Sequence, residues 1–241
     1  TWRDTFQPGS LDPWTLDDGG IYAVPFAYSI VGVYYNKKLF RENGWEVPET
    51  WDEFFQLCET IKAEGIPPIA LTGIYARYID NYLRSAHYSL VGPEEYRRFL
   101  YLEEGTRTHP GYIRAAALIQ KIALHYLQPG WEGMSHTAAQ LEFFQGNAAM
   151  VSTGSWLNSE MRGKIPEDFE LGMFNFPRFE DSIAPATHVQ TGAGYYYVFS
   201  ESEHIEETVD FLRFLTSRQR ALAFAREFEG ISAVQGVPPD L

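Results

Sequence analysis

The sequence contains a single cysteine, Cys58, among its 241 residues, so no disulfide can form within the chain. It also has no run of about 18 apolar residues, and a transmembrane helix is therefore not expected. Its 19 Lys and Arg residues are scattered, and the formal net charge is −13. Nucleic-acid binding is not expected either, because neutralising phosphates requires a basic face.

The motifs of common catalytic and cofactor sites are missing too. The sequence has no H-E-x-x-H, C-x-x-C, P-loop or G-x-S-x-G motif, and its six histidines show no metal-ligand spacing. Adjacent acidic pairs such as Asp17–Asp18 and Glu206–Glu207 fall on predicted turns and helices. A solvated surface explains these pairs better than a glycosidase site, which needs two carboxylates across a cleft. We therefore expect no catalytic residue, no metal and no cofactor.

Amphipathic helical segments alternate with short apolar segments along the chain. In the best-marked helix, Thr50 and Glu53 form a T-x-x-E capping box and Gly65 ends the helix. A helical stretch from Tyr75 to Leu102 is expected to break at Gly92–Pro93. Further helices are predicted over 37–43, 110–130 and 137–145, and from the N-caps Ser202 and Thr216; strands are predicted over 66–73, 147–152, 169–177 and 191–200. The alternation of short strands with long helices predicts an α/β fold.

One segment combines features of a binding site. In "FFQGNAAMVSTGSW", a helix, a glycine and a short strand lead into a sharp turn at Gly154, Ser155 and Trp156. Free backbone N–H groups at a helix start can donate to a ligand oxygen, and a Trp beside them offers an apolar plate. This pairing suits a sugar, which has a C–H face and hydroxyl groups. The alternative is that Trp156 packs in the core.

Several separated motifs resemble those of one family, the extracellular solute-binding proteins of bacterial ABC importers, in the family 1 group that includes many sugar binders. In chain order the motifs are "GGIYAVP", "YYNKKLF", "NGWEVPETWDEF", "FFQGNAAMVSTGSW", "TGAGYYYVFS", "VDFLRFLTS" and "EGISAVQGVP". Their order and spacing resemble those of the family over most of the chain. One departure is in the last motif, where Ser232 and Ala233 stand near a position at which members often have proline.

The resemblance implies a type II periplasmic-binding-protein-like α/β fold, with two lobes joined by a hinge. It assigns residues 1–25 and 173–232 to lobe one, and residues 26–172 with the tail 233–241 to a helix-rich lobe two. Members are usually longer, so the resemblance implies that the chain is incomplete, lacking an N-terminal segment and C-terminal helices. It also implies that the strand after "YAVP" crosses between the lobes, and strand pairing is expected to break at Pro25, which cannot donate a hydrogen bond.

The pattern and the resemblance together suggest twelve ligand-binding residues. Trp156 leads as a stacking plate that matches the G-x-W of the family, with Gly154 and Ser155 supplying close backbone approach and N–H donors. The other candidates are Phe26, Tyr28 and Ser29 on the crossing strand, Thr72, Gly73 and Tyr75 at the end of the 66–73 strand, Arg77 for hydroxyls or a carboxylate, and Gly192 and Gly194 for backbone approach. The alternatives are a surface role for Arg77 and a strand bend at the two glycines.

By the resemblance, the protein is expected to be an extracytoplasmic receptor that binds a mono- or oligosaccharide between two lobes and delivers it to ABC permease subunits. It is expected to act as a monomer in the periplasm or at the cell surface, either free or lipid-anchored. Two alternatives stay open. One is a binding protein for a non-sugar solute, such as a polyamine, a phosphate ester or a metal chelate, and the other is a glycoside-acting enzyme.

Overall fold

The chain forms two compact units in a computed structural model that describes residues 1–75, 77–228 and 230–238. Unit 1 comprises Thr1–Ile30, Gly154–Glu160 and Thr191–Leu241, and unit 2 comprises Val31–Thr153 and Met161–Gln190. These limits differ from the lobes expected from sequence, because 26–30, 154–160 and 233–238 belong to unit 1 and 173–190 belong to unit 2. The last three residues of the predicted lobe-two tail lie outside the described residues.

The secondary structure is mixed, as predicted. The strands are β1 (Val24–Asn36), β2 (Ile69–Ala70), β3 (Met150–Gly154), β4 (Leu171–Phe174), β5 (Gln190–Tyr196) and β6 (Ile231–Ser232). The α-helices are α1 (Lys37–Asn43), α2 (Trp51–Ala63), α3 (Arg77–Leu100), α4 (Pro110–His125), α5 (His136–Phe144), α6 (Leu157–Glu160), α7 (Ile205–Leu215) and α8 (Arg218–Phe228). Short 3₁₀ helices lie at Arg3–Thr5, Asp12–Trp14, Thr106–Thr108 and Trp131–Gly133.

Unit 2 is built on a mixed sheet with the strand order β2-β3-β1-β4. β2 runs parallel to β3, with Ile69 opposite Met150, and β1 runs antiparallel to β4, with Val33 opposite Phe174. β2 is the last named strand of this order, and its Ile69 also forms a parallel bridge with Leu127.

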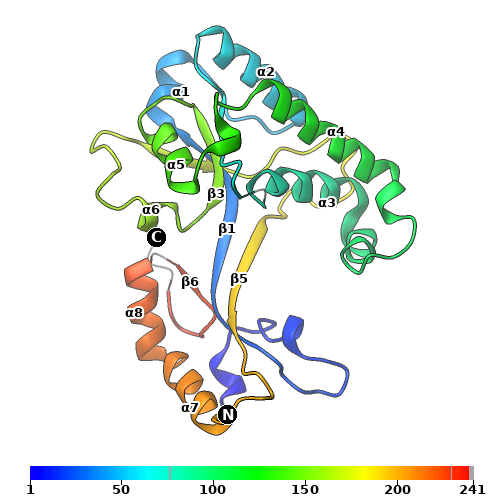
Figure 1. The fold of residues 1–241 in the computed structure, drawn as a ribbon, viewed down its shortest axis with the longest axis vertical. Coiled ribbons are helices and arrows are strands. Elements are labelled where there is room, and N and C mark those ends of the chain that lie inside the picture. The colour runs from blue at the N-terminus through cyan, green and yellow to red at the C-terminus, as the bar shows by residue number, and fades with distance from the viewer. Residues whose placement is uncertain (76, 229, 239–241) are drawn as a thin grey trace. The chain divides into compact units, whose positions relative to one another are not determined.

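Helices pack around this sheet through the apolar faces that the sequence indicates. Trp51, Phe54 and Ile61 of α2 are buried with the thiol-bearing Cys58, and burial raises the pKa of that thiol. The predicted capping box at the start of α2 is present in full. α3 and α4 lie side by side (Figure 1). α3 bends at Gly92, which has a φ of 73°, and this confirms the predicted break.

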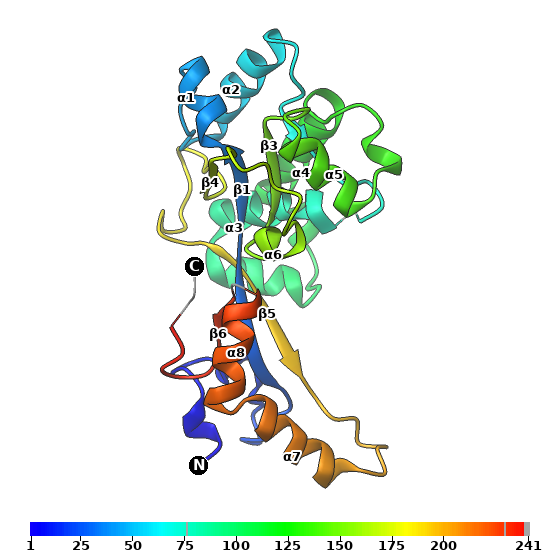
Figure 2. The same cartoon turned by 90° about the vertical axis from the view of Figure 1, so that its left-hand side faces the viewer.

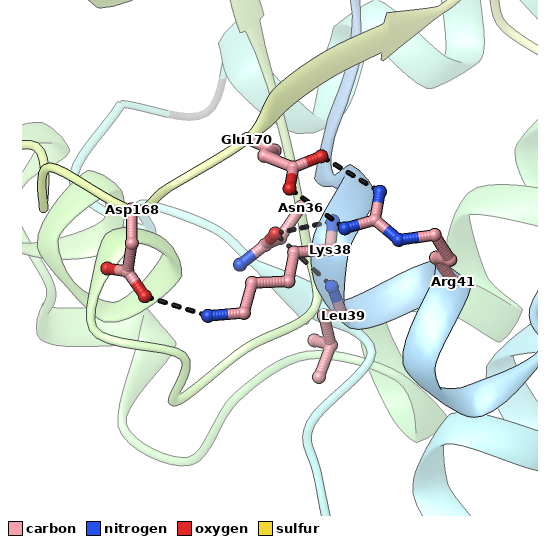
Figure 3. A network of polar contacts seen from close by, with 6 residues as sticks. All are labelled: Asn36, Lys38, Leu39, Arg41, Asp168 and Glu170. Carbon is pink, nitrogen blue, oxygen red and sulfur yellow. Dashed lines mark hydrogen bonds and ion pairs between the residues drawn. The ribbon is translucent and has the colours of Figure 1, made fainter.

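Polar contacts fix the junction between β1 and α1 (Figure 3). The Asn36 side chain accepts hydrogen bonds from the backbone N–H groups of Lys38 and Leu39 and so caps α1. The Arg41 guanidinium donates to both carboxylate oxygens of Glu170 at 2.9 and 2.8 Å, and Lys38 Nζ lies 2.8 Å from an oxygen of Asp168. These cations lower the pKa values of the two carboxyl groups. The pairs are exposed, so they orient α1 more than they stabilise the fold.

Unit 1 holds the first half of β1, which pairs with β5 and, antiparallel, with β6. Ala27 lies opposite Ser232, and α8 packs beside β6 (Figure 2). One core cluster of this unit joins residues near both ends of the chain: Phe6, Leu11, Val24, Leu212 and Ala233. This shared core explains why 233–238 belong to unit 1 and not to unit 2.

Three local expectations are corrected by the structure. β1 is continuous from Val24, and Pro25 is its second residue, where a missing N–H is tolerated; strand pairing does not break there. Ser202 is not the N-cap of α7, since its hydroxyl accepts from the N–H of His204 before the helix begins. Thr216 does not start α8, because its hydroxyl donates back to the Leu212 carbonyl and it ends α7.

No helix in the described part of the chain is both long and apolar enough to span a membrane.

Candidate ligand-binding site

A pocket of about 190 Å³ in unit 1 contains five of the predicted site residues. Its lining is Ala27, Tyr28, Ser29, Ser155, Trp156, Ser159, Gly194, Phe224, Phe228 and Gly230. Four of these ten side chains carry a hydroxyl and four carry an aromatic ring, and none of the ten is charged. A small, partly aromatic pocket with a few polar groups is the usual character of a small-molecule site.

The half-buried Trp156 lies in the turn between β3 and α6. Its indole covers the Cα of Gly154, and a Cβ added to Gly154 would overlap Cζ3 and Cη2 of the ring. The Trp156 carbonyl accepts from the N–H of Glu160 at 3.0 Å and from the hydroxyl of Ser159 at 2.9 Å. Gly154 is therefore needed for the ring position, in addition to any approach by a ligand.

Ser155 is tied to β1 by its main chain and its side chain. Its N–H donates to the carbonyl of Ile30 at 2.9 Å, and its hydroxyl accepts from the N–H of Ile30 at 3.4 Å. The expectation of a free backbone N–H is therefore wrong at Ser155, because that donor is already used. The Ser155 hydroxyl lines the pocket, and the second hydrogen bond is at the long end of the range.

Tyr28 and Ser29 reach the pocket from β1. The Tyr28 hydroxyl donates to the carbonyl of Ser10 at 3.4 Å, and partial burial raises the pKa of the phenol, so it stays protonated. The Ser29 hydroxyl donates to the carbonyl of Gly192, also at 3.4 Å. A Cβ at Gly192 would lie only 2.8 Å from Ser29 Oγ, so this glycine lets β5 pass close to Ser29.

Phe26 is not among the lining residues and packs behind them. Its ring stacks on Tyr196 with centroids 4.5 Å apart and meets Phe224 edge-on at 5.4 Å. It also lies over Gly194, where a Cβ would be 2.6 Å from Phe26 Cζ. Phe26 therefore supports Phe224, which lines the pocket. The lack of a side chain at Gly194 makes room for the Phe26 ring.

The other four candidates lie together in unit 2, outside this pocket. The Thr72 hydroxyl donates to the Met134 carbonyl at 2.8 Å. The N–H of Gly73 donates to the Trp131 carbonyl at 2.7 Å, and a side chain at this glycine would collide with backbone atoms of the 131–132 segment. Tyr75 is 51% exposed. These contacts make Thr72 and Gly73 structural and leave Tyr75 available.

Arg77 is exposed on unit 2. Its guanidinium lies 5.0 Å from the ring centre of Tyr78 and donates to the Tyr78 hydroxyl at 3.2 Å. The Tyr78 ring in turn stacks on His136, with centroids 4.3 Å apart. The positive charge of Arg77 is thus held at an aromatic stack at the start of α3.

Five pocket residues were not anticipated from the sequence: Ala27, Ser159, Phe224, Phe228 and Gly230. The signal for two of them was present, since Phe224 and Phe228 are four residues apart and so share one face of a helix. Among the described residues, no group of three or more His, Cys, Asp or Glu side chains could hold a metal ion. The pocket is thus equipped for ring contacts and hydrogen bonds to hydroxyl groups.

The chain is similar to known solute-binding and sugar-binding proteins. The family model described as bacterial extracellular solute-binding protein matches residues 2–220. A multiple sugar-binding protein of Streptococcus mutans is 31% identical over 236 residues, which cover 91% of this chain and 53% of that protein. The diacetylchitobiose binding protein NgcE of Streptomyces coelicolor is 26% identical over 242 residues, covering 98% of this chain and 51% of that protein.

A solved structure of RafE in complex with raffinose has the same fold. It aligns with a TM-score of 0.81 and 25% sequence identity, over 100% of this chain and 63% of that one. The chain spans about half the length of the two curated relatives.

Proposed function

Because the chain belongs to the bacterial extracellular solute-binding protein family, we propose that it binds a mono- or oligosaccharide and serves as the receptor of an ABC importer. Trp156 is the main contact in this proposal. Its indole offers an apolar face to the C–H groups of a sugar ring, and the hydroxyls of Ser29, Ser155 and Ser159 reach the same pocket. The single observation that carries the proposal is this pairing of ring and hydroxyl groups in one uncharged lining.

The relatives support the same ligand class. Their names refer to multiple sugars and to diacetylchitobiose, and the RafE structure holds raffinose. In the proposal, the receptor acts outside the cytoplasm as a monomer, delivers its ligand to permease subunits and carries out no catalysis. A lipid anchor at the cell surface and a free periplasmic form both fit this role. Units 1 and 2 are assigned to the two lobes of the binding fold, with limits at the unit boundaries.

The remaining predicted residues keep a proposed role in the same receptor. Tyr75, which is exposed on unit 2, is proposed as a second aromatic contact for the ligand. Arg77 is proposed to donate to ligand hydroxyls through guanidinium N–H groups that Tyr78 does not use. Thr72, Gly73, Gly154, Gly192 and Gly194 are proposed to shape the backbone around these contacts.

Isothermal titration calorimetry of the intact protein tests the proposal. The titrants are raffinose, stachyose, galactose and N,N′-diacetylchitobiose, and at least one is expected to bind more tightly than about 1 mM. Trp156→Ala should weaken that binding by about 10-fold or more, because it removes the stacking face. Trp14→Ala is the matched control, since Trp14 is a half-buried indole of unit 1 that contacts the Tyr195 ring and does not line the pocket.

Two results would contradict the saccharide proposal. One is micromolar binding of spermidine or a sugar phosphate that Trp156→Ala leaves unchanged, in the absence of binding to any of the four saccharides. The other is release of nitrophenol from a nitrophenyl glycoside that depends on one acidic side chain, which would indicate an enzyme.

A further inference from the structure

Two phenylalanines of α8 share the pocket with Trp156. Phe224 and Phe228 are one helical turn apart, and their rings stack with centroids 4.7 Å apart at an angle of 28°. Both line the pocket, yet Phe228 keeps 51% of its surface exposed. A large apolar side chain that is half exposed within a pocket has a free face for a ligand.

The positions of these rings are fixed by their neighbours. Phe224 meets Phe26 edge-on at 5.4 Å, and Phe26 is itself stacked on Tyr196. Phe224 also lies close to Gly230, where an added Cβ would be 3.6 Å from the Phe224 ring. Phe228 stacks on this supported ring, so both rings are placed before any ligand arrives, which lowers the entropy cost of binding.

We propose that Phe224 and Phe228 form an aromatic wall of the Trp156 pocket, and that this wall contacts the bound saccharide through the C–H face of a sugar ring. The inference rests on the proposed function and adds a specificity element to it. A phenyl ring has no hydrogen-bond donor or acceptor, so this wall makes favourable contacts only with the apolar C–H face of a sugar ring. The hydroxyls that line the pocket, such as those of Ser155 and Ser159, serve the polar edge of the sugar.

Titration of the intact protein with the saccharide that binds best tests this wall. Phe228→Ala is expected to raise Kd about 3- to 10-fold through loss of one ring contact. Phe228→Tyr keeps the ring and should retain the wild-type Kd. The matched control is Phe211→Ala on α7, which removes a similarly exposed phenylalanine that stacks on Phe214 outside the pocket.

A second substitution guards against a folding effect. Phe224→Leu keeps an apolar side chain next to Phe26 but loses the ring, and it should weaken binding by a similar factor while the melting temperature stays near that of the control. Equal Kd values for Phe228→Ala and Phe211→Ala would overturn the wall and leave the proposed function intact if the wild-type protein still binds. Failure of the wild-type protein to bind any saccharide would overturn both.

Discussion

Single residues decide how the pocket is built, and Gly154 is the clearest case. It has no side chain because the indole of Trp156 occupies that space. The sequence suggested Gly154 as a point of close ligand approach, whereas the structure gives it a role in holding the ring. A methyl group at this position would collide with the Trp156 ring, so its effect on binding tests the role in holding the ring.

Gly154→Ala is expected to weaken saccharide binding about as much as Trp156→Ala, that is by about 10-fold or more, because the new Cβ displaces the indole. Calorimetric titration measures the loss. Gly133→Ala is the control, since a Cβ there meets open space, and it should bind as the wild type does. Normal binding by Gly154→Ala would show that the ring position is not needed.

His87 is the most deeply buried histidine of the described chain and takes no part in the pocket. It is 1% exposed, and neither ring nitrogen has a hydrogen-bond partner. Its imidazole ring makes T-shaped contacts with the rings of Tyr96, Phe99 and Tyr112, at centroid distances of 4.7 to 5.4 Å. Burial, aided by the nearby His109, lowers the pKa of His87 to about 4.

The free energy of unfolding should therefore decrease as the pH is lowered from the pKa of His87 in the unfolded chain to its pKa in the folded chain. The unfolded chain takes up a proton near pH 6.5 while the folded chain resists until about pH 4. Unfolding free energies from urea titration should decline more steeply between pH 6.5 and 4 for the wild type than for His87→Phe. Parallel curves for the two proteins would show that His87 does not cause the loss.

At the level of helices and strands, end signals were the most predictable part of the fold. The Thr50–Glu53 capping box and the helix over 37–43 are predicted correctly, because both depend on residues close together in the sequence. The predicted N-caps Ser202 and Thr216 are wrong. The Ser202 hydroxyl accepts from the N–H of His204 and the Thr216 hydroxyl donates to the Leu212 carbonyl, and neither caps a helix start. The break in strand pairing predicted at Pro25 is also wrong, because β1 begins at Val24 and Pro25 is only its second residue.

The capping box gives a direct prediction for α2. Thr50→Ala removes the acceptor for the N–H of Glu53 and should lower the free energy of unfolding by about 1 kcal/mol. Thr60→Ala on the same helix is the control, because that exposed hydroxyl only donates to the Gln56 carbonyl within the helix. Urea denaturation compares the two. An equal effect of both substitutions would mean that the cap contributes no more than an ordinary surface hydroxyl.

The pocket itself was half predictable, for a physical reason. Trp156 stands in a recognisable local motif, so one segment of sequence was enough to find it. Phe224 and Gly230 lie close to β6 in the sequence, and β6 pairs with β1, about 200 positions away. A single sequence does not encode that pairing in any local pattern. The hydrogen bonds between Ser155 and Ile30 also join distant parts of the sequence, and they use the Ser155 N–H that the local motif predicts to be free.

For the molecule as a whole, ligand binding should appear as added thermal stability. A ligand present at about 100 times its Kd stabilises the folded state by about 2.7 kcal/mol, provided that the unfolded chain does not bind it. The best saccharide of the titration panel should therefore raise the melting temperature of the intact protein by several degrees in calorimetry. The increase should vanish for Trp156→Ala at the same concentration. An unchanged increase in that variant would place the ligand away from this pocket.

The burial of Cys58 has a practical consequence for spectroscopy. Its side chain is fully enclosed and its thiol is held in the unreactive protonated form. A thiol introduced at the exposed position 158, as Asn158→Cys, would then react alone with a maleimide dye, without prior removal of the native cysteine. Because that position is next to Ser159 at the pocket, the dye would report by its fluorescence whether a ligand binds at the proposed site.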